Sequence, residues 1–142
     1  SIFQRGVTCW AIRFTPGWMI EKSLRQTVAN EAVVTDAMVD RYWELLRYPG
    51  NRTATFTRMA LPRVPYSQQQ FASLKLPVLV MWGEQDNLIP LSSGKLMATL
   101  IPGATLITYP GIGHIPMEEA AQRSAGDLVG WLAAHGVPGK PG

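Results

Sequence analysis

Two short apolar runs, separated by a helical pattern, set the strongest limit on how this chain can fold. Residues 77–82 (PVLVMW) form one continuous apolar run, and residues 104–109 (ATLITY) form a second. A run such as the first is typical of a strand that is covered on both faces. The segment between them, which includes residues 92–101, is long enough for a crossover helix, and such crossovers join parallel strands with a right-handed turn. The pattern predicts an α/β protein built on a parallel βαβ unit.

Two helices are expected around these strands. Ser92 or Ser93 is the predicted cap of the crossover helix. The packed side of that helix is predicted to carry Leu96, Met97, Leu100 and Ile101. The last helix is expected over residues 118–135, and its end at His135 is interpreted as a helix cap and not as a catalytic residue. Its predicted buried face consists of Ala121, Ala125, Leu128, Val129 and Leu132.

The first part of the chain has helical patterns only. Short helices are expected over residues 21–33 and 52–60, with Asn51 as the cap of the second. Between them, Thr35 is the expected N-cap of a longer helix. The apolar stripe of that helix consists of Met38, Val39, Tyr42, Trp43, Leu45 and Leu46.

A join separates the helical part from the α/β part. Residues 61–70 contain two prolines and several polar side chains that interrupt the pattern. We therefore predict a helical cap or lid region over residues 1–65 and part of an α/β core over residues 66–142.

Composition excludes several classes of function. Of the 142 residues, 46% are hydrophobic and 16% are charged, as in an ordinary globular domain. The 13 basic and 10 acidic residues include no Lys/Arg run, so nucleic-acid binding is not predicted. No apolar run is long enough to cross a membrane, and no signal peptide is indicated. Cys9, the sole cysteine, cannot form an internal disulfide, and a cytoplasmic location is expected.

Two residues that can act together follow the two predicted strands. Asp86 comes just after the first strand, and His114 comes just after the second. Because the carboxyl ends of parallel strands open onto one edge of a sheet, we expect these side chains to lie close together. An ionised Asp that accepts from one imidazole nitrogen leaves the other nitrogen free to take a proton from a nucleophile or a water. Asp86 and His114 are therefore the predicted catalytic residues.

Three other acidic residues near these motifs are expected to have structural roles. Glu84 is the rival acid, but it lies nearer the strand and is expected to face solvent or the turn backbone. Glu118 and Glu119 are expected to favour the positive start of the last helix.

The order of these motifs resembles the C-terminal half of an α/β-hydrolase. The matching features are a strand, WGEQD, a proline, a helix, a second strand, GIGH with a proline and a glutamate, and a last helix. The resemblance covers residues 70–135 and implies a partial α/β-hydrolase fold, with Asp86 as the acid and His114 as the histidine of the triad. Residues 18–60 resemble the cap of haloalkane dehalogenases and epoxide hydrolases.

One part of the family pattern is missing from this sequence. The nucleophile elbow needs small residues around its Ser because the turn is strained, and G-x-S-x-G occurs nowhere. Ser92 and Ser93 follow the acid, whereas the family order is nucleophile, acid, histidine. The resemblance therefore implies the C-terminal half of a longer hydrolase. Since the sequence does not begin with Met, Ser1 is expected to lie inside that longer chain.

The leading hypothesis is a hydrolase that acts on a small, largely apolar ester or a related compound. No cofactor is expected, and two distant histidines with one cysteine indicate no metal site. A Ser nucleophile would form an acyl-enzyme, and an Asp would give a dehalogenase or an epoxide hydrolase, for which Tyr42, Tyr48 and Tyr66 are candidate acids. The chain alone is expected to be inactive, with the missing N-terminal half as its partner. The alternative is a non-catalytic, truncated hydrolase fragment that associates with a partner chain through an unpaired strand edge.

Overall fold

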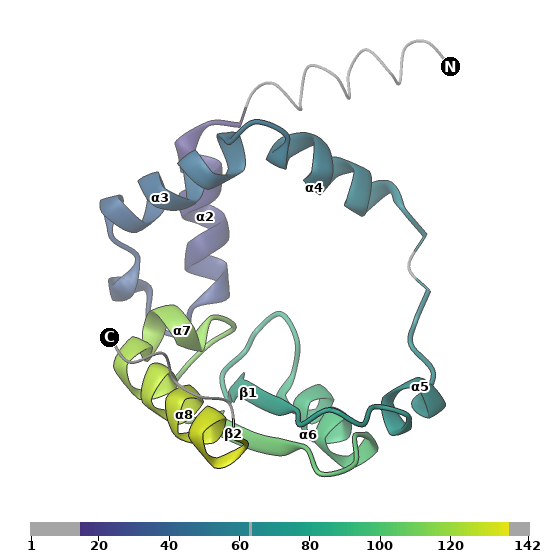
Figure 1. Ribbon diagram of the computed structural model, residues 1–142. Helices are drawn as coiled ribbons and strands as arrows, with labels where there is room; N and C mark the ends of the chain where they lie inside the picture. The colour runs from purple at the N-terminus through teal and green to yellow at the C-terminus, as the bar shows by residue number, and fades with distance from the viewer. Residues whose placement is uncertain (1–14, 63, 137–142) are drawn as a thin grey trace. The chain divides into compact units, whose positions relative to one another are not determined.

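The chain forms two compact units, which the computed structural model describes over residues 15–62 and 64–136 (Figure 1). The first unit contains Ser1–Arg25 and Val34–Val64, and the second contains Gln26–Val33 and Pro65–Gly142. A short segment from the first half of the sequence therefore belongs to the second unit. Within the described ranges, no helix is long and apolar enough to span a lipid bilayer.

Helices make up the described part of the first unit. They are α2 (Gly17–Thr27), whose last two residues belong to the second unit, α3 (Asp36–Arg47) and α4 (Asn51–Ala60). Thr35 is the N-cap of α3, as predicted, because its Oγ1 accepts from Met38 N at 3.2 Å. Leu24, Val34 and Met38 are buried apolar residues of this unit.

The helix predicted over residues 21–33 is shorter in the structure. α2 ends at Thr27, and a separate 3₁₀ turn, η1, covers Glu31–Val33. Asn30 Oδ1 accepts from Ala32 N at 3.0 Å. This side-chain bond gives the backbone a local turn in place of a continued helix.

The cap of α4 also differs from the prediction. Asn51 is the first residue of α4, and its Nδ2 donates to Leu45 O at 2.7 Å. The side chain therefore satisfies a carbonyl of the preceding helix instead of capping the next one. Gly50 takes the cap position with a φ of 91°, a backbone conformation that favours glycine.

A two-stranded parallel sheet forms the centre of the second unit. β1 (Leu79–Gly83) pairs with β2 (Thr105–Tyr109), and α6 (Leu91–Leu100) makes the crossover between them. The other helices are α5 (Gln68–Ala72), α7 (Pro116–Glu119) and α8 (Ala121–Ala134). The parallel βαβ unit predicted from the apolar runs is confirmed.

Helices α6 and α8 cover opposite faces of this sheet. Trp82 pairs with Thr108, so Trp82 and the next residue of β2, Tyr109, point to opposite faces. The Trp82 ring lies against Gly94 of α6, where a Cβ would come within 2.7 Å of the ring. Tyr109, which is fully buried, donates its hydroxyl to Asp127 of α8 at 2.9 Å. Both faces of the sheet are therefore covered, as the apolar run predicted.

α6 begins earlier than predicted. Its predicted packed side is confirmed at Ile101, which is 2% exposed, and Met97 and Leu100 are half-buried, so Leu96 alone departs from the prediction. Ser92 and Ser93 lie within its first turn, and neither caps it. Leu96, expected on the packed side, is 54% exposed. The Trp82 ring occupies the space in front of the helix, and Gly94 is the residue of α6 that leaves room for it.

The predicted last helix is broken, and its predicted buried face is wrong. α7 and α8 replace a single helix over residues 118–135, with the break at Ala120. Ser124 is the buried residue of α8, whereas Leu128 and Val129 are 41% and 65% exposed. The other exposed members of the predicted face are Ala121 and Ala125. Hydrogen bonds between β2 and α8, and not the apolar stripe, mark the side of α8 that packs on the sheet.

Candidate active site

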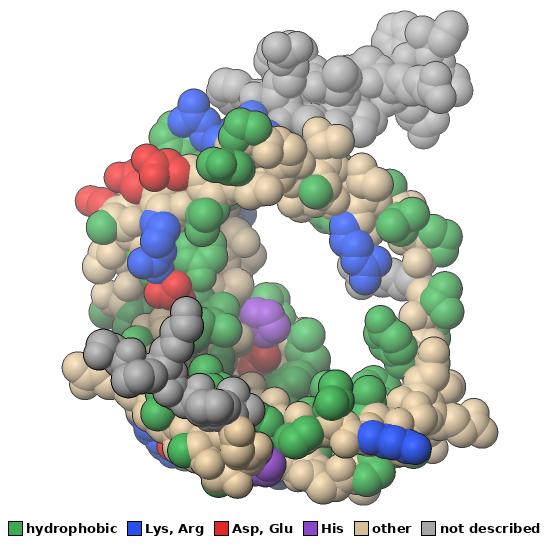
Figure 2. All heavy atoms as spheres, in the orientation of Figure 1, with side chains coloured by type: hydrophobic (Ala, Val, Ile, Leu, Met, Phe, Trp, Pro, Cys, Tyr) green, Lys and Arg blue, Asp and Glu red, His purple; other side chains and the backbone are tan. Residues whose placement is uncertain are grey.

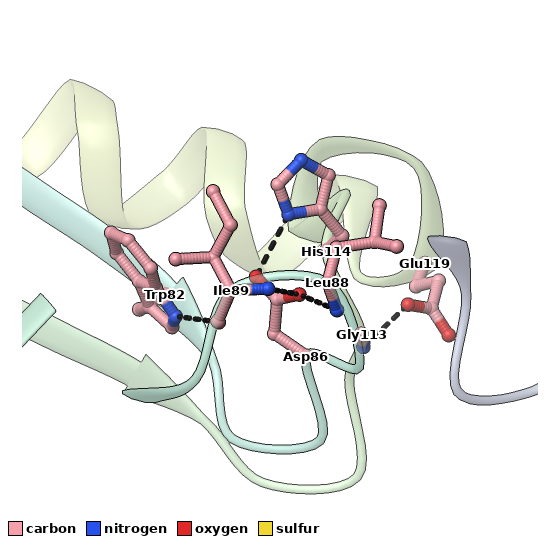
Figure 3. A network of polar contacts seen from close by, with 7 residues as sticks. All are labelled: Trp82, Asp86, Leu88, Ile89, Gly113, His114 and Glu119. Atoms are coloured by element: carbon pink, nitrogen blue, oxygen red, sulfur yellow. Dashed lines mark hydrogen bonds and ion pairs between the residues drawn. The ribbon is translucent and has the colours of Figure 1, made fainter. Parts of the chain in front are cut away.

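Asp86 lies in the turn after β1, where both of its carboxylate oxygens are engaged (Figure 3). Its Oδ1 accepts from the backbone N–H groups of Leu88 and Ile89 at 2.8 and 2.9 Å. The side chain is 3% exposed. Burial by itself raises the pKa of this carboxyl, but the hydrogen bonds from Ile89, His114 and Leu88 hold the pKa below its ordinary value of 3.8. The group is therefore an anion at neutral pH.

The turn that carries Asp86 is tied to the loop that follows β2. Glu84 N donates to Tyr109 O at 3.0 Å, and Gln85 N donates to Ile112 O at 2.9 Å. The Gln85 side chain completes the connection, because its Oε1 accepts from Gly111 N. These bonds hold the two strand-end loops side by side.

Gly83 makes this close approach possible. A Cβ at this position would lie 1.9 Å from Gly113 O and 2.4 Å from Ile112 O. Both contacts are with backbone atoms, which cannot move aside as the end of a flexible side chain can. Only glycine at the end of β1 lets the histidine loop come this near.

His114 stands on that loop and meets Asp86 across the edge of the sheet. Its Nδ1 lies 2.8 Å from Asp86 Oδ2, and its side chain is 34% exposed. A carboxylate can only accept, so Nδ1 carries the proton and Nε2 is left as an acceptor. Figure 3 shows Nε2 on the side of the ring that points away from Asp86. The hydrogen bond expected from the strand-end positions is confirmed.

The other candidates lie apart from this pair. Glu84 accepts from Thr108 Oγ1 at 2.7 Å, so the rival acid is bonded to a strand hydroxyl and not to His114. His135 is the C-cap of α8, and its ring lies stacked on Trp131. No group of three or more His, Cys, Asp or Glu side chains in the described ranges could hold a metal ion.

An apolar hollow opens beside His114. Its lining residues are Met81, His114, Pro116, Met117, Ala121, Ser124, Ala125 and Leu128. Most of these side chains are apolar, so the space next to the imidazole favours the hydrocarbon part of a ligand over a charged group.

Sequence reasoning missed residues that hold the two loops in place. Gly83 directly follows the apolar run, and a glycine at a strand end signals a close backbone approach. Gln85 carries no comparable signal, because its bond to Gly111 depends on how the loops are placed. Glu119, assigned to the helix start, accepts three backbone N–H groups from two other segments.

The chain matches a family model described as alpha/beta hydrolase fold over residues 18–121. That range is more than half of the 142 residues, and it contains both Asp86 and His114. The chain therefore belongs to the α/β-hydrolase fold family.

Relatives that match part of the chain include lipases and esterases. Lipase 3 of Moraxella sp. (strain TA144) is 38% identical over 56 residues, which are 39% of this chain and 18% of the lipase. A bifunctional esterase/perhydrolase of Acinetobacter calcoaceticus is 40% identical over 63 residues, which are 40% of this chain and 23% of that enzyme.

Solved structures show the same fold over most of the chain. A meta-cleavage product hydrolase from Pseudomonas fluorescens IP01 has a TM-score of 0.73 and 22% identity, and the match covers 87% of this chain and 48% of that one. A serine hydrolase involved in carbazole degradation has a TM-score of 0.76 and 19% identity, with 84% and 48% covered. This chain spans less than half the length of each of these proteins and relatives.

Proposed function

We propose that this chain carries the acid and the histidine of an ester hydrolase, with Asp86 as the orienting acid and His114 as the general base. The observation that carries the proposal is the 2.8 Å contact between Asp86 Oδ2 and His114 Nδ1, made by a carboxylate that is 3% exposed. Similarity to lipases and to an esterase supports an ester substrate. The apolar hollow beside His114 supports a small apolar group on that ester.

The free nitrogen of His114 moves the proton in this proposal. Nε2 takes the proton of a nucleophile hydroxyl as its oxygen bonds to the ester carbonyl carbon, and Nε2 then gives that proton to the leaving alcohol. In the second half of the reaction, water attacks the acyl-enzyme and loses a proton to Nε2. That proton returns to the nucleophile as the acid leaves. Asp86 stays ionised throughout and stabilises the imidazolium.

The nucleophile, a Ser in this mechanism and an Asp in the dehalogenase or epoxide hydrolase variant, belongs in this proposal to an N-terminal part of the fold that precedes the present sequence. Two observations support such a part. Among the described strands, β1 pairs with β2 on one edge and with none on the other. The outer side of α8 is apolar and exposed at Leu128 and Val129. Additional strands and helices of the family fold would cover both surfaces.

The cap proposed for this hydrolase is the region predicted over residues 1–65, apart from Gln26–Val33 and Pro65, which belong to the second unit. Helices α3 and α4 belong to a unit distinct from the one that holds Asp86 and His114, as a cap requires. This cap role, the epoxide hydrolase variant of the chemistry and a cytoplasmic location stay predictions.

A second candidate function is that of a non-catalytic hydrolase fragment. The same open strand edge of β1 could pair with a different chain, because unpaired edges are sites of strand addition. In that case Asp86 and His114 would be retained for the geometry of the loops and not for turnover.

Kinetics of a completed enzyme separate these two functions. The chain is expressed with the coding sequence upstream of Ser1, and hydrolysis of a short p-nitrophenyl ester is measured. Asp86→Asn is expected to lower kcat by about 10⁴ with little change in KM, because the amide cannot hold the required tautomer. His114→Ala is expected to remove turnover in the same way.

Two controls make the result specific. Glu84→Gln removes an acid from the same turn that is bonded to Thr108, so activity is expected to stay close to wild type. The 142-residue chain alone is expected to hydrolyse the ester no faster than its His114→Ala variant. An unchanged kcat in Asp86→Asn would contradict the proposed role of the pair and favour the fragment.

A further inference from the structure

A carboxylate outside the Asp86–His114 pair holds the backbone on which His114 stands. Glu119, the last residue of α7, accepts three backbone hydrogen bonds. Its Oε2 accepts from Gly113 N at 2.6 Å (Figure 3). Its Oε1 accepts from Ala29 N and Asn30 N at 2.8 and 3.0 Å. The donors come from two distant parts of the sequence, and all of them lie in the second unit.

The segment of residues 27–30, called the strap below, is fixed to the histidine loop by further contacts. His114 N donates to Thr27 O at 2.7 Å. A Cβ on the buried Gly113 would lie 2.6 Å from Thr27 O and 2.7 Å from Ala29 N, so the two backbones touch with no room for a side chain. Val28 anchors the strap, since it is 3% exposed.

We propose that Glu119 is a positioning residue for His114, an inference that rests on the function proposed above. Its carboxylate joins the strap to the residue just before His114 and thereby fixes where the imidazole stands relative to Asp86. All three partners of Glu119 are N–H donors, and a carboxylate is the side-chain group that only accepts. Charge-assisted bonds of this kind are stronger than bonds between neutral groups.

The position of the strap in the sequence gives the bonds of Glu119 a wider effect. In the sequence it connects α2 to α3, which carry the helical part of the chain. Glu119, which lies 90 residues after Ala29, therefore links this connection to the histidine loop.

Amide hydrogen exchange in the 142-residue chain tests this role without any need for turnover. Glu119→Gln keeps the shape but leaves one acceptor oxygen and places an NH₂ group against a donor. Oε1 accepts from two N–H groups, so the oxygen of the amide is expected to keep the hydrogen bonds from Ala29 N and Asn30 N. The hydrogen bond from Gly113 N is then expected to be lost. The exchange rates of the Gly113 and His114 amides are expected to rise roughly 10- to 100-fold, because a hydrogen bond to a charged group is lost.

Glu118→Gln is the matched control, because it makes the same change of charge one residue earlier on α7. Exchange at Gly113 and His114 is expected to stay as in wild type in that variant, and exchange at β2 amides such as that of Leu106 is expected to stay unchanged in both. Glu119→Asp keeps the charge but is one methylene shorter, so it cannot reach the strap and Gly113 together. It is expected to accelerate exchange as well.

In the completed enzyme, Glu119→Gln is expected to lower kcat with KM nearly unchanged, because a displaced general base slows the chemical step without weakening substrate binding. Unchanged exchange at Gly113 and His114 in Glu119→Gln would overturn the proposal. Loss of cooperative unfolding in both Glu119 variants, but not in Glu118→Gln, would also overturn it and make Glu119 a residue of folding. Failure of the acid–histidine function itself would appear separately, as an unchanged kcat in Asp86→Asn.

Discussion

The carboxyl edge of the sheet and the outer side of α8 belong to the same unit, but they differ in how completely their contacts are made. At the edge, Asp86 uses both carboxylate oxygens and is 3% exposed. On α8, the apolar Leu128 and Val129 are 41% and 65% exposed. Large apolar side chains reach the surface in both units, as the green atoms in Figure 2 show.

The acid and histidine of the proposed site are therefore fully positioned, although apolar side chains of the same unit remain exposed. The acid and the histidine are held by two loops that bond to each other and by the strap, all within one unit. Their geometry therefore needs no contact with an N-terminal part of the fold. The outer side of α8 has the composition of a core surface, yet Leu128 and Val129 are exposed there.

The largest effect is expected from filling the space at Gly83. Gly83→Ala would place a Cβ 1.9 Å from Gly113 O, so the loops must separate, and we expect a loss of at least about 3 kcal/mol in the free energy of unfolding. Gly126→Ala on α8 is the control, because nothing lies within 4 Å of its Cβ and the helix gains roughly 0.5 to 1 kcal/mol. Urea unfolding of both variants gives the comparison. Equal stabilities would show that the edge is not tightly packed.

A matched pair of valine substitutions tests the two regions with one chemical change. Val80→Ala, in β1, removes two methyl groups from a residue that is 5% exposed, and we expect a loss of about 2 kcal/mol. Val129→Ala, on α8, makes the same change at 65% exposure and is expected to be neutral or slightly stabilising, since Ala favours a helix. Thermal and urea unfolding measure both. A loss above about 1 kcal/mol at Val129 would mean that the outer side of α8 is covered.

A smaller effect is expected from pH. Because the pKa of Asp86 in the folded chain lies below its ordinary value of 3.8, the unfolded chain takes up a proton first as the pH falls. The stability that Asp86 contributes is thus fully present above pH 3.8 and is lost as the pH falls through the folded pKa. Urea unfolding between about pH 5 and about pH 3 should show a steeper decline in wild type than in Asp86→Asn. Parallel curves would show that ionised Asp86 does not stabilise the edge of the sheet.

The strand pairing and the acid–histidine pair could be predicted because each rests on a strong local signal. Apolar runs on both sides of a crossover imply parallel strands, and parallel strands bring Asp86 and His114 to one edge. Helix α5 had a local signal too, the capping box of Ser67 and Gln70, but its polar composition led us to interpret it as part of the join.

Other features could not be predicted because they depend on the placement of distant segments. The packed side of α8 is marked by hydrogen bonds from Tyr109 to Asp127 and from Trp131 to Thr105, and not by the apolar stripe. Two of the three bonds of Glu119 come from the strap, which the sequence places in the helical half. Apolar periodicity shows which side of a helix is apolar, but not which side packs against another segment of the same chain.

Orientation of His114 by Asp86 is visible in the tautomer of the imidazole. Nitrogen-15 NMR of the 142-residue chain distinguishes its two histidines, and His114→Ala assigns them. In wild type, neutral His114 is expected to carry its proton on Nδ1, bonded to Asp86, and Asp86→Asn is expected to shift this proton toward Nε2. His135, whose Nδ1 donates to Trp131 O at 2.8 Å, should keep its tautomer in both and serves as the internal control. A wild-type His114 protonated on Nε2, or a tautomer that Asp86→Asn leaves unchanged, would contradict the claim that Asp86 orients His114 for catalysis.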